Sequence, residues 1–399
     1  MSMRRVRIAV IFTLMLVLSI GLAACGGQSS EKASTEPQKT ESNNKTENKQ
    51  AGPDPDAELA KLDTEILTKG PNGEEPASYK TVKLTEEDLK KVKEMNLTAA
   101  ISMQYMGNDW SATQVKALKA EFEKMGVKVV GVTDANFKPE KQTSDIETLM
   151  AKKPDILVSI PVDTVANAGA YKKAAQQGAK IVFMNQAAKG LKSGEDYVTV
   201  ISPADYENGA RAAHLIAREL GGKGKIGIIY YDANFPTTEI RYKAAKDVFA
   251  KYPGITIAEE QGIMGPNFVG AAEEAANALL LREPDLDAIW GIWDVPAEGI
   301  VSAVRTAGRA DDMIVTTIDL GKNVAMELAK GGIIKGIGAQ TVYDAGVTEA
   351  RAAVLGLLGK SVAPFIVMNG ITVDKRNVLE AWKQVYSTEP SKELMDAAR

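Results

Sequence analysis

The stretch PDLDAIWGIWDVPAEG, residues 284–299, predicts a strand that passes directly into a helix. Ala288–Ile292 is a short apolar run typical of a buried parallel strand, and Pro296 stands where a helix would begin. Trp293 and Asp294 then lie at the carboxyl end of the strand, where open α/β sheets bind ligands. An aromatic face beside a carboxylate suits a sugar ring, but a core tryptophan followed by a helix-capping aspartate explains the same residues.

The composition is that of an ordinary soluble protein with room for two domains. The chain has 399 residues, of which 45% are hydrophobic and 25% charged, and a formal net charge of −4. This acidic balance argues against a nucleic-acid partner. With one cysteine and one histidine, the chain cannot carry a disulfide framework or a metal site built mainly from these residues. We expect no metal and no cofactor.

The first 24 residues are typical of a secretory signal peptide. Arg4, Arg5 and Arg7 precede the apolar run Ile8–Leu22, which is too short for a comfortable transmembrane helix. The sequence LAAC at residues 22–25 resembles a bacterial lipobox, which implies cleavage before Cys25 and lipidation of its sulfur. An uncut anchor and a free cysteine are the alternatives.

Residues 25–52 are then a lipidated, polar stalk that cannot bury enough apolar surface to order itself. We therefore expect an extracytoplasmic protein that is lipid-anchored to the cell membrane. Residues 53–96 form an N-terminal extension with a helix start at Thr85, but the sequence does not tell whether this extension docks on the rest.

From Leu97 onward, short β-rich runs alternate with amphipathic helices. A strand over Leu97–Met103 precedes a helix over Ser111–Met125, for example, and Lys180–Met184 is another strand. Such alternation predicts parallel sheets covered by helices on both faces, and the units are too many for one modest sheet. The predicted fold is α/β, with two Rossmann-like lobes.

The residues that follow the predicted strands are nearly all polar. They are Gln104, Asn108, Asp109, Trp110, Asp134, Asp163, Asn185, Gln186, Asp232, Trp293, Asp294, Asp319 and Gln340. This pattern predicts the polar lining of a binding cleft, with aromatic faces for the ligand. His214 lies in the middle of a predicted helix, and no histidine or cysteine follows a strand to activate a nucleophile, so an enzyme is disfavoured.

Several motifs carry a resemblance that covers about residues 97–386. They are ISMQYMGNDWSA (101–112), the run from Asp134 to Asp163, the segment ending at Asn185, TTEIRYKAA (237–245), PDLDAIWGIWD (284–294), TTIDLG (316–321) and GIGAQ (336–340). Together they resemble the ribose/galactose-type periplasmic sugar-binding proteins, which have the type I solute-binding fold of ABC importers. The resemblance implies two lobes that close on a ligand about a three-crossing hinge.

The resemblance also implies lobe boundaries and ligand residues. The crossings would fall near Ser202, Thr341 and Met368, which assigns 97–202 and 342–368 to one lobe, 203–341 and 369–386 to the other, and 387–399 to a tail. The implied ligand residues are Gln104, Asn108, Trp110, Asn185, Gln186, Arg241, Asn267, Trp293, Asp294, Asp319 and Gln340.

Two departures from the family pattern bear on the ligand. Asn185 and Gln186 stand where such proteins usually have Asp-Arg, which weakens a claim to ribose or galactose, and Trp293 stands where an amide is common. Asp134 and Asp163 are expected to cap helices rather than bind ligand.

We therefore expect a monomeric lipoprotein that captures a small sugar or polyol and delivers it to the transmembrane subunits of an ABC permease. Two alternatives stay open: a receptor that presents its ligand to a membrane sensor, and a binder of a nucleoside or furanosyl signalling molecule. A sugar-responsive transcription regulator is disfavoured, because a signal peptide and stalk stand where its DNA-binding head would be.

Overall fold

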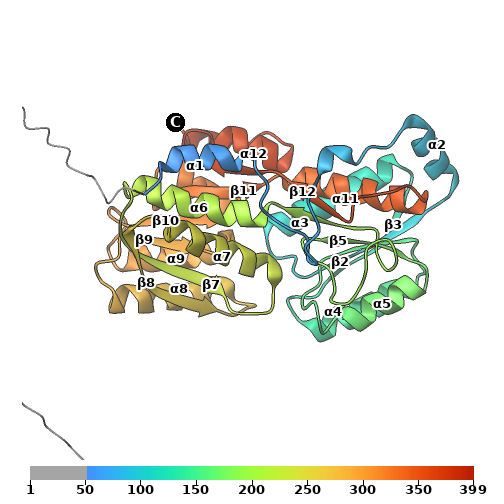
Figure 1. The fold of residues 1–399 in the computed structure, drawn as a ribbon, viewed down its shortest axis with the longest axis horizontal. Helices are drawn as coiled ribbons and strands as arrows, with labels where there is room; N and C mark the ends of the chain where they lie inside the picture. Colours follow the sequence, from blue (N-terminus) through green and yellow to red (C-terminus); the bar gives the residue numbers. More distant parts are fainter. Residues whose placement is uncertain (1–51) are drawn as a thin grey trace, which may run out of the picture. The chain divides into compact units, whose positions relative to one another are not determined.

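The computed structural model describes residues 52–399, and within them two sheets are each covered by helices (Figure 1). The predicted signal peptide, the lipidated Cys25 and the stalk up to residue 51 lie outside the described residues. The chain passes from one sheet to the other after β6, after β11 and after β12, so the predicted α/β fold of two lobes and three crossings is confirmed.

The first lobe is built on a seven-stranded, wholly parallel sheet in the order β1-β12-β6-β5-β4-β2-β3. Its strands are β1 (Ala77–Ser78), β2 (Thr98–Met103), β3 (Lys128–Asp134), β4 (Ile156–Ser159), β5 (Lys180–Met184), β6 (Thr199–Pro203) and β12 (Phe365–Met368). Its helices are α2 (Glu86–Glu94), α3 (Asp109–Lys124), α4 (Pro139–Met150), α5 (Ala168–Gln176) and α11 (Val342–Leu357).

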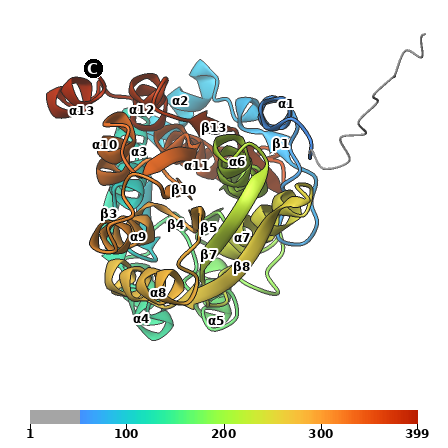
Figure 2. The same ribbon diagram turned by 90° about the vertical axis from the view of Figure 1, so that its left-hand side faces the viewer.

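The second lobe has a six-stranded sheet in the order β13-β11-β10-β9-β7-β8. Its strands are β7 (Lys223–Tyr231), β8 (Gly254–Ile263), β9 (Ala288–Gly291), β10 (Ile314–Ile318), β11 (Ile334–Gln340) and β13 (Gly370–Val373). Its helices are α6 (Asp205–Glu219), α7 (Pro236–Phe249), α8 (Phe268–Arg282), α9 (Asp294–Thr306), α10 (Lys322–Ala329), α12 (Val378–Tyr386) and α13 (Lys392–Ala397). Figure 2 shows α8 and α9 on one side of this sheet and α6 and α7 on the other.

The edge strand β13 departs from the expected parallel pairing, because it runs antiparallel to β11. Only Asn369 separates β12 from β13. The parallel strands of both sheets point their carboxyl ends toward the other lobe. A chain that leaves the carboxyl end of β12 therefore enters the second sheet at the edge formed by the carboxyl ends of its strands. Its direction is therefore reversed.

Local sequence signals account for several helix starts. Pro139 occupies the first turn of α4, where its fixed φ suits the helix and no N–H is needed. The Asn108 side chain accepts a hydrogen bond from Ser111 N and so begins α3. Thr85 and Asp88 form a reciprocal capping box at α2. The signals at α3 and α4 lie in the loops that follow β2 and β3, where they fix the point at which each helix begins.

The N-terminal extension docks on both lobes. Its first helix, α1 (Pro55–Leu62), packs against α6 of the second lobe, whereas β1 extends the sheet of the first lobe beside β12. A short 3₁₀ helix, Tyr79–Thr81, leads toward α2. The sequence left open whether this extension docks on the rest of the chain. The structure shows that it does, through contacts with both lobes.

Candidate functional site

The carboxyl ends of strands from both lobes meet around a cavity of about 50 Å³. Its lining residues are Gln104, Tyr105, Asn108, Trp110, Phe137, Ile160, Asn185, Tyr231, Phe235, Thr237, Thr238, Arg241, Trp293, Asp319 and Gln340. Eight of the eleven ligand residues expected from the sequence are among them. Strand ends from the two sheets therefore lie around one cavity.

A chain of paired polar groups runs through this cavity. The Arg241 guanidinium donates from Nε to Asp205 Oδ1 at 2.8 Å and from an Nη to Asp319 Oδ2 at 3.3 Å. Gln340 donates from its amide to Asp319 and accepts a hydrogen bond from Trp110 Nε1 at 3.0 Å. We call these five residues the polar chain. It begins on α6 in the second lobe and reaches the first lobe through Trp110 at its far end, while Asp205 at its start accepts a hydrogen bond from Ser202 of β6 at 3.1 Å.

The carboxyl groups of this region are buried, and burial dominates their electrostatics. Burial raises the pKa of Asp205 to about 6, although the Arg241 charge works in the opposite direction. Burial likewise raises the pKa of Asp319. The pKa of Asp294 lies well above its usual range because of burial and the nearby charge of Asp319. One guanidinium thus serves more carboxyl groups than it can neutralise.

A cluster of aromatic rings also contributes to the wall of the cavity. Phe137 of the first lobe lies with its ring centroid 5.0 Å from Phe268, 6.0 Å from Tyr231 and 6.1 Å from Phe235, all in edge-on arrangements. Trp293 lies 4.9 Å from Phe268, centroid to centroid. With Tyr105, which lies 5.3 Å from Phe137, these six rings are the aromatic cluster. They present apolar surface from both lobes.

Most of the aromatic cluster was not predicted as part of the site. Tyr105, Phe137, Tyr231 and Phe235 were absent from the expected ligand residues, although Tyr105 lies inside the quoted loop 101–112. Their common signal is position, because each lies within a few residues of the carboxyl end of a strand. A search for aromatic residues at strand ends, rather than for polar ones, would have found them.

Three residues of the cavity hold the backbone in the left-handed region. The φ angles are 56° at Phe137, 58° at Asn185 and 69° at Asp319. Residues other than glycine adopt this conformation at a cost, and such positions concentrate at functional sites. The surrounding structure therefore holds three side chains of the cavity in orientations that an ordinary strand end would not give.

Two buried acceptors in the cavity have no hydrogen-bond partner among the described residues. They are Gln104 Oε1 and Asn185 Oδ1. Buried polar atoms are nearly always satisfied, because leaving one unpaired costs about 1–3 kcal/mol. Both atoms are therefore suited to receive hydrogen bonds from hydroxyl or amine groups of a ligand.

Three of the expected ligand residues do not line the cavity. Gln186 spans the lobes beside it, donating to Pro161 O at 2.8 Å and accepting from Thr237 N at 3.3 Å. Asn267 is exposed and caps α8 through Gly270 N. Asp294 is buried at the start of α9, where it accepts from its neighbour Val295 N. Each of these side chains is hydrogen-bonded to a backbone group outside the cavity wall and does not line the cavity.

Asp134 and Asp163 were expected to cap helices, and this expectation is wrong, because the N-cap residues are Lys138 at α4 and Asn167 at α5. The two aspartates instead bond backbone N–H groups in the strand-end loops that precede these helices. Asp163 Oδ1 accepts from Val165 N at 2.8 Å and Ala166 N at 2.9 Å. Asp134 Oδ1 accepts from Asn136 N at 2.8 Å. These two carboxylates shape the loops on the first lobe and leave ligand contact to other residues.

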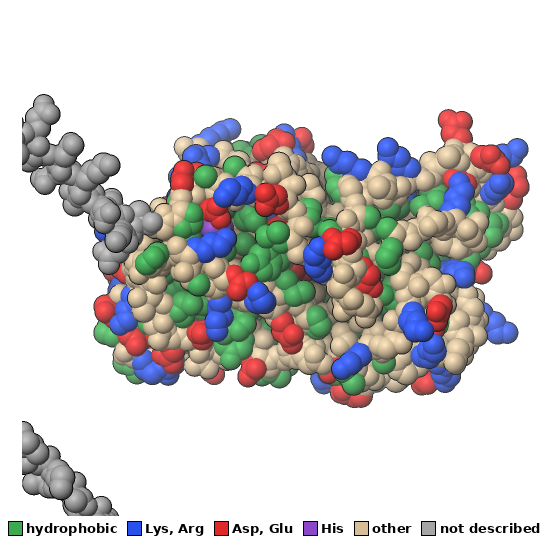
Figure 3. All heavy atoms as spheres, viewed as in Figure 1, with side chains coloured by type: hydrophobic (Ala, Val, Ile, Leu, Met, Phe, Trp, Pro, Cys, Tyr) green, Lys and Arg blue, Asp and Glu red, His purple; other side chains and the backbone are tan. Residues whose placement is uncertain are grey.

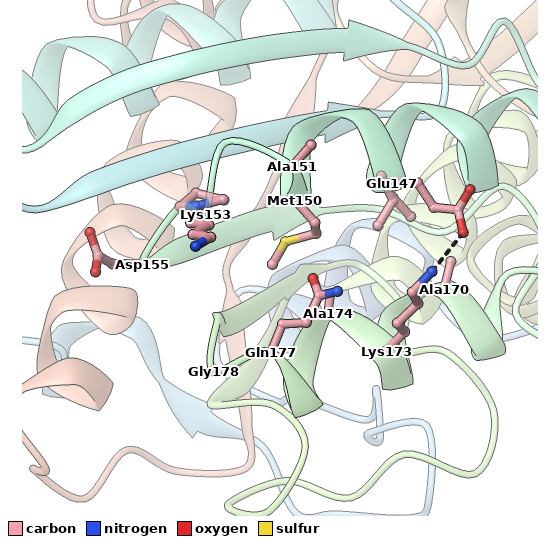
Figure 4. Close-up of a pocket in the computed structure, with 12 residues that line it drawn as sticks. Glu147, Met150, Ala151, Lys153, Asp155, Ala170, Lys173, Ala174, Gln177 and Gly178 are labelled. Atoms are coloured by element: carbon pink, nitrogen blue, oxygen red, sulfur yellow. Dashed lines mark hydrogen bonds and ion pairs between the residues drawn. The ribbon is translucent and has the colours of Figure 1, made fainter.

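A larger cavity, of about 680 Å³, lies between α4 and α5 on the first lobe (Figure 4). Met150 and Ala174 contribute apolar surface there, and Glu147 and Lys173 pair with each other at 3.0 Å. Within residues 52–399, no lining side chain of this cavity has a buried, unpartnered polar atom. It therefore lacks the convergent polar groups of a specific site, and the cleft between the lobes is the better candidate.

Other kinds of site find little support in the described part of the chain. Across residues 52–399 no group of three or more His, Cys, Asp or Glu side chains is arranged to hold a metal ion. In the same residues no helix is long and apolar enough to span a bilayer. On the face drawn in Figure 3, basic and acidic side chains are interspersed.

Known proteins resemble this chain over most of the region that builds the cleft. Residues 99–361 match the family model of a periplasmic binding protein domain. A putative rhizopine-binding protein of Rhizobium meliloti is 26% identical over 252 residues, which cover 62% of this chain and 81% of that protein. A ribose import binding protein of Bacillus subtilis is 25% identical over 241 residues, covering 57% and 70% respectively.

Solved structures resemble it as well. A solute-binding protein of an ABC transporter from Agrobacterium vitis, bound with alpha-D-tagatopyranose, has a TM-score of 0.68 and 25% identity, and the match covers 73% of this chain and 100% of that one. Another from Bacillus halodurans, with bound myo-inositol, has a TM-score of 0.65 and covers 72% and 98%. At 18% identity, the second likeness concerns the fold alone.

Proposed function

The chain belongs to the periplasmic binding protein family, and on that premise we propose that it is the extracytoplasmic solute-binding component of an ABC importer. Its ligand is a small sugar or polyol, captured between the two lobes. The observation that carries this proposal is the cavity itself, which is lined by residues of the polar chain and by aromatic rings from both lobes. The related proteins named for ribose and rhizopine, and the structure with bound tagatopyranose, support the ligand class.

The mechanism of capture is ligand-favoured closure. Arg241, Asp319 and Gln340 offer paired donors and acceptors to ring hydroxyls, and Trp293 and Phe137 cover the C–H faces of the ring. Hydrogen bonds to the ligand replace hydrogen bonds to water at little net gain, so the aromatic contacts supply much of the affinity. A ligand that contacts both lobes favours the closed arrangement by its greater affinity for it.

The departures at Asn185 and Gln186 narrow the ligand class. Asn185 contributes an acceptor without a partner, and Gln186 is occupied between the lobes, so neither supplies the charged pair that the family pattern would lead one to expect. Fewer fixed charges on this side favour a pentose, a deoxysugar or a polyol. Binding in the micromolar range, about −8 kcal/mol, is the order of affinity expected for such a site.

The remaining parts of the proposal concern location and partners. Cleavage before Cys25 and lipidation of its sulfur would leave the protein anchored at the outer side of the cell membrane by a polar stalk. From there the monomeric, ligand-loaded protein would deliver its cargo to the transmembrane subunits of the permease.

A thermal-shift screen against pentoses, hexoses, polyols and nucleosides tests the ligand class. A ligand that binds only the native state stabilises it by about 2.7 kcal/mol at a hundredfold excess over its Kd. We expect a shift with one sugar or polyol that is lost in Asp319→Ala. A shift with a nucleoside but with no sugar or polyol would overturn the ligand class and leave the fold assignment standing.

A further inference from the structure

Residues 55–81 form a continuous connection between the two lobes that precedes the part of the chain matched by the family model. That match begins at residue 99. Within the connection, α1 lies on α6 of the second lobe (Figure 1), and β1 pairs with β12 of the first lobe. We call residues 55–81 the strap.

The strap is held to the second lobe by a carboxylate that is fully buried in α6. Glu207 accepts hydrogen bonds from Thr68 N at 3.0 Å, from Thr68 Oγ1 at 2.6 Å and from Leu67 N. The Thr68 hydroxyl also accepts from Tyr206 N at 3.0 Å. A buried carboxylate that is satisfied in this way holds its partners firmly, because losing them would leave it unpaired in the interior.

A second buried charge of α6 strengthens this anchor one turn further along. Arg211, which is 1% exposed, donates to Leu62 O at 2.5 Å and to Asp63 Oδ1 at 3.1 Å. Both acceptors lie at the end of α1. The side of α6 that carries Glu207 and Arg211 is therefore covered by the strap.

The strap reaches the first lobe almost immediately after Thr68. Gly70 packs against the Phe365 ring of β12 so closely that an added Cβ would lie 3.0 Å from it, and Ala77 then pairs with Ile366. Only Lys69 separates the residue held by Glu207 from the residue packed on β12. Two consecutive Cα–Cα steps span at most about 7.6 Å, so the lobes cannot separate far at this point.

The strap also borders the ligand-binding cleft. Thr68 belongs to the wall of a cavity of about 360 Å³, and so do Asn185 and Thr237 of the ligand cavity. Asp205, which holds Arg241 in the polar chain, lies in the same wall and is two residues from Glu207. The anchor of the strap and the orienting group of the site therefore share the first turn of α6.

We infer that the strap is a fourth hinge connection and that Glu207 is a positioning residue, which sets ligand affinity by restricting how far and in which direction the lobes separate. The inference rests on the proposed function, in which a ligand closes the lobes. A hinge held at one further point can swing about fewer axes, so the binding-competent arrangement is a larger fraction of the ligand-free population. Apparent affinity scales with that fraction for every ligand alike.

The test compares Thr68→Val and Glu207→Ala with the wild-type full chain in a Cys25→Ser background. Valine keeps the shape of threonine and removes the hydroxyl, which provides a mild variant if Glu207→Ala folds poorly. Spin labels on cysteines at the exposed positions Gln176 in α5 and Leu281 in α8 report the distance between the lobes. The matched control is Lys360→Met. It removes the ion pair that Lys360 makes with Asp88 of α2 at 2.6 Å, which lies within the first lobe and does not involve the strap.

We expect the ligand-free strap variants to show a broader and longer distribution of distances between the labels. Affinity should fall by about fivefold, and by the same factor for every ligand that binds, so that the preference among ligands is unchanged. Lys360→Met should match the wild type in both measurements. If Thr68→Val and Glu207→Ala lower the melting temperature but leave the distances and affinities at wild-type values, the strap serves stability alone and the inference is wrong.

The same labels separate failure of the inference from failure of the proposed function. If ligand does not shorten the distance in the wild-type chain, closure itself is contradicted. The comparison of ligand-free variants still decides whether the strap restricts the hinge, since it involves no ligand.

Discussion

The polar chain and the aromatic cluster meet in one cavity, yet they depend on the two lobes in different ways. Four of the five polar residues belong to the second lobe, where Arg241 stays bonded to Asp205 and Asp319 whatever the first lobe does. The aromatic cluster instead places Phe137 of the first lobe among three rings of the second. Orientation of the ligand is thus prepared in one lobe, and the apolar enclosure exists only when both lobes meet.

This difference implies a division of labour that substitutions can separate. Groups that are already paired and oriented discriminate among ligands, because a ligand that lacks the matching hydroxyl leaves them unpaired. Apolar rings that close over the ligand raise affinity with little regard to its stereochemistry. Breaking the polar chain should change selectivity, and breaking the cluster should change affinity alone.

The largest effect is expected from Asp319→Ala. It removes the acceptor shared by Arg241 and Gln340, so binding should weaken by about 3–4 kcal/mol, as when one partner of a buried pair is lost. Arg241 keeps Asp205, and the fold should survive. Isothermal titration with several ligands measures both affinity and selectivity. The exposed Asp232→Ala at the end of β7 is the control, and wild-type affinity in Asp319→Ala would remove Asp319 from the site.

A pH series examines the polar chain without ligand. The folded-state pKa of Asp205 is raised to about 6, so the native state holds a proton that the unfolded chain releases nearer pH 4. The stability from this group is therefore complete below about pH 4 and is lost as pH rises to about 6, a change of about 3 kcal/mol. Urea unfolding from pH 4 to 7 should show that Asp205→Asn lacks this part of the slope. If the free energy of unfolding depended on pH in the same way in both proteins, the raised pKa of Asp205 would be contradicted.

Trp293→Leu breaks the aromatic cluster. The leucine keeps apolar volume but loses the flat face against Phe268, so affinity should fall by about 2 kcal/mol, with the order of preferred ligands unchanged. Trp382→Leu on α12 serves as the control, since Trp382 stacks on Tyr386 and does not line the cavity. A changed order of preference in Trp293→Leu would mean that the tryptophan also discriminates among ligands.

The smallest effect is expected from Gln104→Leu. This change should not lower the stability of the ligand-free protein, but it should weaken ligand binding. Removal of the unpartnered Oε1 should leave the free energy of unfolding of the ligand-free protein unchanged or raise it by up to about 1 kcal/mol. Ligand binding should weaken by about 1 kcal/mol, since a hydroxyl loses its acceptor. Urea unfolding measures the free energy of unfolding, and titration of the same sample with ligand measures the affinity. A loss of stability without a loss of affinity would show that Gln104 serves the fold only.

Much of the fold and part of the site could be predicted from the sequence because their signals are local. The strand at Lys180–Met184 was predicted with its observed bounds, since apolar runs flanked by helices report directly on a parallel sheet. Polar residues at strand ends converge by topology, which explains why Asp319 and Gln340 could be placed together without contacts.

What escaped prediction depends on partners far away in the chain. Asp205 follows the short strand β6, which was not predicted from the sequence. Its partner Arg241 is 36 residues away in the chain. Glu207 and Arg211 are charged residues in the first two turns of α6, and such residues usually face solvent. Here they are buried by strap residues that lie 139 and 149 positions away in the chain. A single sequence contains no periodic signal for such pairs.

The short strand β1 has a consequence for the solubility of the chain. Ala77 and Ser78 cover the outer edge of β12, whose four residues, FIVM, are all buried. Uncovered, that edge would present unpaired backbone groups and an apolar strand, which is a template for pairing with another copy. A chain shortened to begin near residue 97, where the family resemblance starts, should therefore associate edge to edge in solution, although it would retain every residue of the ligand cavity.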